Sequence, residues 1–226
     1  MSDEENSIDV NVLVAIGPVR LATLLAETAK ANPSMRRRLQ FELSAQKSEN
    51  VPEAVRRWIS ELREQTSFLD ADQVDELSRE LDAIRAAIVS NVPQAAPKLA
   101  PDLMWQLFTL AGTVYNRTSE EGWEVSQVFD HACADLVKVS VDAEVDPKLF
   151  ATKVVSAIST GQYGEYSALI PATASAQPWA TAYVSEIKAL LLRLLDEPFG
   201  SSGSTNGEHG HVLRRALREL DFPTAT

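Results

Sequence analysis

Apolar residues recur at helical spacing along almost the whole chain, and this pattern constrains the fold more than any other feature of the sequence. The clearest example is the segment 70–91. Its apolar residues, spaced by three, four, three and four positions, are Val74, Leu77, Leu81, Ile84 and Ile88. This spacing places them in one seam along a helix of about six turns.

Prolines and acidic residues mark the starts of the expected helices, because a proline lacks the N–H that has no partner in a first turn. Asp70 or Asp72 is expected to cap the helix at 70–91. Pro171 is expected to kink or end a short helix that contains Tyr166. The prolines assigned to helix starts are Pro18, Pro33, Pro52, Pro101, Pro147 and Pro178.

These signals predict an all-α fold, with no significant sheet. About ten helices are joined mostly by turns short enough to make neighbours antiparallel. We therefore expect an array of helical hairpins, tetratricopeptide-like or HEAT-like, although no strict repeat of fixed period is visible.

The segment 8–16 departs from this pattern, because its apolar residues alternate as they do in a strand. A strand without a partner would leave its backbone N–H and C=O groups unsatisfied, and no second strand follows. We therefore expect one or two helical turns here.

Composition divides the chain into four segments. Residues 1–7 are acidic and are expected to be disordered, 8–196 form the array, and 197–207 form a flexible linker rich in Gly and Ser. Residues 208–226 are expected to form an amphipathic helix that packs on the array or on a partner. Its apolar face consists of Leu213, Leu217 and Leu220.

Charge and hydropathy argue against two classes of function, nucleic-acid binding and membrane spanning. The net charge of −11 repels nucleic acid at long range and therefore disfavours nucleic-acid binding. The longest apolar runs fall far short of the roughly 20 residues needed to cross a bilayer, so we expect no membrane span. The acidic N-terminus and the single cysteine, Cys133, predict a cytoplasmic protein.

Three consecutive arginines, Arg36 to Arg38, form the most chemically suggestive stretch. On a helix they fan out around the axis, so they cannot share one face. Arg38 also lies one turn before Glu42, which favours an ordinary solvated or salt-bridged surface. The alternative is a patch that binds an anion or nucleic acid, made by Arg36, Arg37, Arg56 and Arg57.

Catalytic and metal-binding signatures are absent from the sequence: there is no phosphate-binding loop, no dinucleotide-binding glycine motif and no nucleophile elbow. His131 and Cys133 point away from each other on a helix, so they form no dyad, and His131 is expected to meet Asp135. His209 and His211 lack a third anchor for a metal ion. We therefore expect no cofactor, and an enzyme assembled from distant residues stays the least favoured alternative.

Some aromatic residues are expected to pack in the core, and others mark two places where a partner could bind. Trp58 and Trp123 follow apolar stripes and are expected in the core. Trp105 lies off its stripe and either fills a second interface or is exposed. Tyr163 and Tyr166 lie at a glycine-flanked corner between helices, where grooves form, although simple packing explains them as well.

Several stretches resemble an uncharacterised bacterial all-helical family whose longer members sometimes follow a SWIM-type zinc-finger module. The resemblance covers most of residues 12–176 and implies that 8–16 is helical and that the arginines lie on the second helix of an array. This chain lacks the zinc-finger cysteines, and longer relatives continue past the helix that contains ALREL, so it is expected to be a short or truncated member. The matching stretches are LVAIGPVRLATLLAETAKANPSMRRRLQFEL, SFLDADQVDELSRELDAI, LMWQLFTLAGTVYNR, VSQVFDHACADL and YGEYSALIPATA.

Taken together, these observations predict a non-catalytic scaffold that binds a protein partner or a second copy of itself. The family resemblance adds no activity. The residues that we assign to partner binding are Trp105, Tyr163, Tyr166, Leu213, Leu217 and Leu220.

Overall fold

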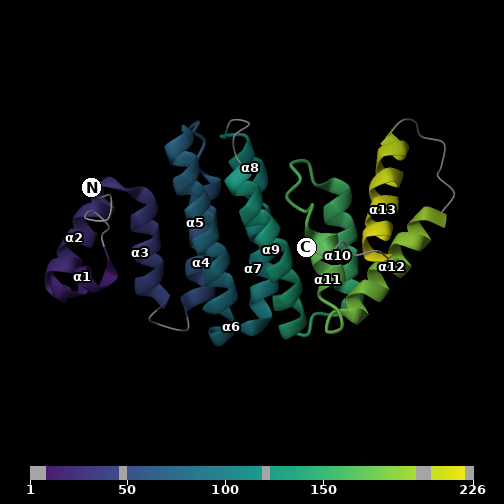
Figure 1. Ribbon diagram of the computed structural model, residues 1–226, viewed down its shortest axis with the longest axis horizontal. Helices are drawn as coiled ribbons and strands as arrows, with labels where there is room; N and C mark the ends of the chain where they lie inside the picture. The colour runs from purple at the N-terminus through teal and green to yellow at the C-terminus, as the bar shows by residue number, and fades with distance from the viewer. Residues whose placement is uncertain (1–8, 46–49, 119–122, 197–204, 222–226) are drawn as a thin grey trace, which may run out of the picture.

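The computed structural model describes residues 9–45, 50–118, 123–196 and 205–221. It is all-α, and no strand occurs in these ranges. Figure 1 shows the helices standing side by side, from the purple helices α1 and α2 at one end to α12 and the yellow helix α13 at the other. The repeat type of this array stays a prediction. The expected segment 1–7 and most of 197–207 lie outside the described ranges.

The helices follow closely on one another along the chain. One of them, η3, is a 3-10 helix, and the others are α-helices. Their bounds are α1 Val10–Ala15, α2 Pro18–Ala31, α3 Pro33–Ala45, α4 Val51–Arg63, α5 Ala71–Ser90, α6 Val92–Ala95, η3 Pro97–Leu99, α7 Ala100–Phe108, α8 Ala111–Tyr115, α9 Trp123–Asp142, α10 Pro147–Thr160, α11 Leu169–Ser175, α12 Thr181–Asp196 and α13 Thr205–Asp221.

Local sequence signals explain most of these boundaries. The Asp70 side chain accepts from the backbone N–H of Gln73, and the Gln73 side chain accepts from the backbone N–H of Asp70, which makes a capping box at α5. Asp146 caps α10 by accepting from the backbone N–H groups of Lys148 and Leu149. The helix at Val10–Ala15 confirms the helical interpretation of that segment.

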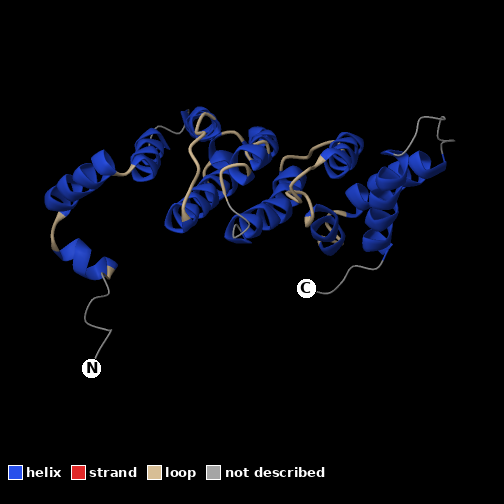
Figure 2. Ribbon diagram, turned by 90° about the horizontal axis from the view of Figure 1, so that it is seen from above, coloured by secondary structure: helices blue, strands red, loops and turns tan. Residues whose placement is uncertain are grey.

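The hydrophobic core runs along the middle of the array. The apolar seam predicted for 70–91 is buried throughout: Val74, Leu77, Leu81, Ile84 and Ile88. It packs against α7 and α9, while α10, α11 and α12 extend the core toward the C-terminal end. Figure 2 shows that the array is thicker here than at its N-terminal end, where α1 and α2 form a single file of helices.

Three local predictions need correction. Trp123 is 61% exposed rather than in the core, because it is the first residue of α9 and precedes the part of the helix that packs. Pro171 lies inside the first turn of α11 and does not end it, since the N–H that proline lacks would have no helical partner there. Helix α12 begins at Thr181 rather than at Pro178, where the sequence predicted its start.

Candidate functional site

The N-terminal end of the array carries an unusual group of exposed apolar side chains, which we call the N-terminal apolar surface. Their exposed fractions range from 44% to 81%, and neither α1 nor α2 buries any residue. The members of this surface are Val10, Val12, Val14, Ile16 and Val19.

The sequence of α1 explains this exposure. Residues 10–19 contain no charged side chain, and α1 is apolar around most of its circumference. A helix of this kind is normally buried on every side. Here α1 packs against α2, and α2 packs in turn against α3, so most of the apolar surface of α1 faces solvent.

Our sequence interpretation missed this surface, because it treated 8–16 only as a question of helix or strand. The uncharged run from Val10 to Val19 was the signal that could have revealed it.

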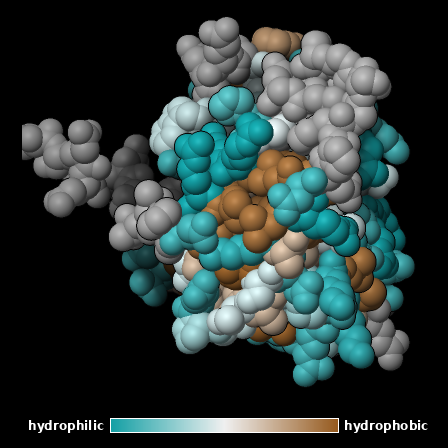
Figure 3. Space-filling view, turned by 90° about the vertical axis from the view of Figure 1, so that its right-hand side faces the viewer, coloured by the Kyte–Doolittle hydropathy of each residue, from teal (hydrophilic) through white to brown (hydrophobic). Residues whose placement is uncertain are grey.

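The opposite end of the array, formed by α12 and α13, also shows a hydrophobic patch that is rimmed by hydrophilic residues (Figure 3). Leu192 on α12 is about half exposed. The leucines predicted to bind a partner here already pack within the chain. Leu213 and Leu220 are buried against the array, and Leu217 is half-buried. Helix α13 therefore uses its apolar face to pack on α11 and α12.

A cavity of about 190 Å³ lies between α13 and the corner that joins α10 to α11. Tyr166 lines it together with apolar residues from the three helices, and the ion pair between Arg215 and Glu219 lies beside it. The apolar residues that line it are Ile158, Ile170, Val212 and Ala216.

The aromatic residues predicted as contact points pack mainly against other rings. Tyr166 lies 5.0 Å from Phe108 and 6.1 Å from Trp105, measured between ring centroids. Tyr163 stacks on Tyr115 with a centroid distance of 5.6 Å. Burial raises the pKa of Tyr166 to about 12. These contacts agree with the packing interpretation and leave only Tyr163 clearly exposed.

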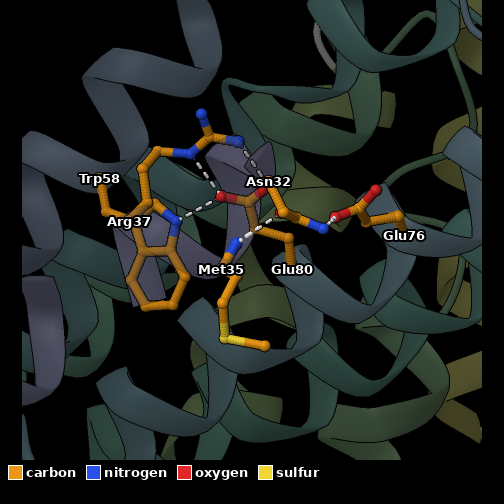
Figure 4. Close-up of polar contacts among 6 residues, drawn as sticks. All are labelled: Asn32, Met35, Arg37, Trp58, Glu76 and Glu80. Atoms are coloured by element: carbon orange, nitrogen blue, oxygen red, sulfur yellow. Dashed lines mark hydrogen bonds and ion pairs between the residues drawn. The ribbon is translucent and has the colours of Figure 1, made fainter. Parts of the chain in front are cut away.

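The arginine stretch contributes one buried contact rather than a patch. Arg37 donates from Nε and Nη2 to the two carboxylate oxygens of Glu80 on α5, at 2.6 and 2.7 Å. The Trp58 indole N–H of α4 donates to the same carboxylate at 2.7 Å (Figure 4). A bidentate arginine contact of this kind is both strong and geometrically specific. The contacts of Arg37 and Trp58 with Glu80 together join α3, α4 and α5.

Asn32 supports this network from the start of α3. Its side-chain oxygen accepts from the Met35 backbone N–H at 2.8 Å, and its amide donates to Glu76 at 2.6 Å (Figure 4). The same residue thus caps α3 and links it to α5.

The other arginines of the predicted patch lie apart from this network. Arg36 is exposed, and Arg56 pairs with Glu53 on the same helix at 2.7 Å. Arg57 and Arg37 share only a cavity of about 20 Å³, which has room for about one water molecule. The structure therefore does not gather the four arginines into one open surface.

A hollow of about 610 Å³ lies between α5 and α9, with Arg38 of α3 at its wall, and its lining carries both charges. His131 lines it, but Asp135, its predicted partner, forms an ion pair with Arg85. Cys133 is buried, and desolvation raises the pKa of its thiol, so it is kept protonated and unreactive. Among the residues that the structure describes, no group of three or more His, Cys, Asp or Glu side chains is arranged to hold a metal ion.

Within the described ranges, no helix is both long enough and apolar enough to span a bilayer. Comparisons with curated proteins and with solved structures found no match. A comparison with family models matched residues 4–211 to a family of unknown function, DUF6880. The match covers nearly the whole chain, and we conclude that this chain belongs to the DUF6880 family.

Proposed function

We propose that this chain is a non-catalytic protein-interaction module that associates with a second copy of itself through the N-terminal apolar surface. The observation that carries this proposal is the exposure of five large apolar side chains on two helices that bury no residue. Large exposed apolar surfaces on a folded protein typically mark a contact with another molecule. The buried, protonated Cys133 is compatible with a cytoplasmic location.

Charge permits a second copy as the occupant at this end of the array. Two chains that each carry a net charge of −11 repel one another over most of their surfaces. The segment 10–19 has no charge, so two copies can meet there without placing like charges against each other. Because a two-fold contact brings the same patch of each copy together, it requires no complementary surface elsewhere and closes at a dimer.

The test is light scattering coupled to size-exclusion chromatography over a range of protein concentrations. The wild-type chain is expected to form a dimer, and the double variant Val12→Glu, Val14→Glu is expected to be a monomer. Glutamate favours a helix more than valine does, so these substitutions remove the apolar contact and preserve α1. The matched control is Leu149→Glu, which adds charge at a residue of similar exposure on α10 and is expected to leave the dimer intact.

Two results would overturn the proposal. One is a wild-type chain that stays monomeric at every concentration. The other is dissociation by Leu192→Glu at the opposite end of the array, because that would show that the α12 end takes part in the contact.

A further inference from the structure

A buried carboxylate lines the cavity between α13 and the corner that joins α10 to α11. It belongs to Glu165, of which only 7% is exposed. Its Oε2 accepts from the Tyr163 backbone N–H at 2.9 Å. Within the described ranges, no cationic side chain forms an ion pair with it. Buried carboxylates are normally paired with a cation or fully hydrogen-bonded, so this one has the capacity for a further partner.

The second carboxylate oxygen of Glu165, Oε1, is accessible. It accepts no hydrogen bond from a described residue. Two other side-chain atoms in the described ranges, Nη1 of Arg117 and Oγ of Ser140, also lack a partner but are sealed from solvent, whereas Oε1 of Glu165 is not. Because the rest of Glu165 is buried and the residue lines the cavity, a molecule in the cavity has access to this oxygen.

The charges around this cavity do not balance. Among the described residues that line it, Arg215 is the one cationic side chain, and it is already paired with Glu219 at 2.7 Å. The charge of Glu165 therefore has no counterion among these residues. The neighbouring Tyr166 reflects this charge, because burial and then the carboxylate of Glu165 raise its pKa to about 12. The lining thus carries one excess negative charge.

The rest of the cavity wall is mainly apolar. Its volume of about 190 Å³ exceeds that of an engineered apolar cavity of about 150 Å³ that binds benzene. The ring of Tyr166 also lines it, and the face of an aromatic ring attracts a cation. The other apolar side chains of the wall belong to Ile158, Ile170, Val212 and Ala216. The cavity therefore combines room for one ring or a short aliphatic chain with a single unbalanced carboxylate.

We propose that this cavity binds a small organic amine, whose ammonium group donates to Oε1 of Glu165 and whose apolar body packs against the aliphatic wall. The ammonium supplies the positive charge that the lining lacks, and a charge-assisted hydrogen bond is stronger than a neutral one. A neutral apolar molecule would fill the space but leave the carboxylate without a counterion. A small organic acid is disfavoured, because Glu165 would repel it.

The backbone N–H signals of glycines in a nuclear magnetic resonance spectrum provide the measurement. Gly161 and Gly164 line the cavity, whereas Gly17 lies between α1 and α2 and serves as an internal reference. Benzylamine, which is a cation at neutral pH, is expected to shift the Gly161 and Gly164 signals until they saturate, and the Gly17 signal is expected to stay in place. Benzyl alcohol has the same ring without the charge and is expected to bind about tenfold more weakly or worse. Benzoate is expected to produce no saturable shift.

Variants decide whether Glu165 and the cavity hold the amine. Glu165→Gln keeps an acceptor oxygen for the Tyr163 N–H and removes the charge, so it is expected to weaken benzylamine binding about tenfold or more. The matched control is Glu124→Gln, which removes the same charge from a different hollow and is expected to leave binding unchanged. Val212→Phe fills the cavity from an exposed position on α13 and is expected to abolish binding, which gives a second test if the glutamine variant folds poorly.

The proposal is overturned if benzylamine gives no saturable shift of Gly161 and Gly164. It is also overturned if benzyl alcohol binds as tightly as benzylamine does, because the carboxylate would then play no part. A folded Glu165→Gln or Val212→Phe variant that binds benzylamine as tightly as the wild-type chain does would exclude this cavity as the site.

Discussion

At the scale of single residues, Glu80 on α5 links three helices in the N-terminal half of the array, because its partners lie on α3 and α4. It is buried and accepts three hydrogen bonds, from Arg37 and Trp58. A buried ion pair adds little net stability, but the loss of one partner is costly because the other charge is left uncompensated.

We therefore expect Glu80→Gln to lower the free energy of unfolding by about 3–5 kcal/mol, because it leaves Arg37 buried without its counterion. Urea denaturation measures this change. The control is Glu53→Gln, which breaks a pair with Arg56 whose carboxylate is largely exposed, and a loss of at most about 1 kcal/mol is expected. Equal losses in the two variants would contradict the role assigned to the buried pair.

Tyr183 gives a prediction about alkaline pH. Its hydroxyl donates to the carbonyls of Ser140 and Val145, at 2.8 and 3.0 Å, and burial raises its pKa to about 12. In the unfolded chain the pKa of a tyrosine is about 10. Below about pH 10 the hydroxyl is protonated in both states, so its contribution to stability is fully present. As the pH rises from about 10 toward 12, the unfolded chain loses this proton first and stability falls.

Urea denaturation on either side of about pH 10 is expected to show this loss in the wild-type chain. Tyr183→Phe keeps the ring that stacks on Phe150 at 4.3 Å and removes the titrating hydroxyl. The variant is expected to be less stable at neutral pH and to lose less stability at alkaline pH. An identical alkaline loss in both proteins would exclude Tyr183 as the source.

At the scale of single elements, α13 illustrates what an amphipathic pattern leaves open. Its apolar stripe was expected to pack on the array or on a partner, and the structure buries Leu213, Ala216 and Leu220 against the array. The periodicity of a stripe shows that one face is covered, but it does not show which surface covers it.

We expect Leu213→Ala and Leu220→Ala each to destabilise the protein by about 2–5 kcal/mol, because each leaves a cavity in a packed interface. Val212→Ala, at a neighbouring residue that is 38% exposed, is expected to change stability by about 0.5 kcal/mol or less. Thermal or urea unfolding measures all three. If the two leucine variants were as stable as Val212→Ala, α13 would not be part of the core.

At the scale of the whole molecule, the array is unevenly packed. The core is concentrated from α4 to α13, while α1 and α2 bury no residue and form the thin end of the array (Figure 2). Segments with few buried contacts open locally at low free-energy cost.

Hydrogen exchange is therefore expected to be much faster in α1 and α2 than in α5 when the protein is dilute. If the N-terminal apolar surface forms the proposed dimer, exchange in α1 and α2 slows as the protein concentration rises, and α5 is unaffected. Uniformly slow exchange in the dilute protein would contradict the uneven packing.

The sequence by itself determined the helical class, most helix starts and the buried seam of α5, because capping and apolar periodicity act over a few neighbouring residues. It also indicated correctly that Arg36 to Arg38 cannot share one face. Tertiary structure decided which of them would be buried, since Arg37 meets Glu80, a residue 43 positions away. Tertiary structure also decided the burial of Arg117, because its surroundings come from α3, α5 and the segment between α4 and α5. Local spacing cannot specify such contacts, because they depend on how separate helices are placed against one another.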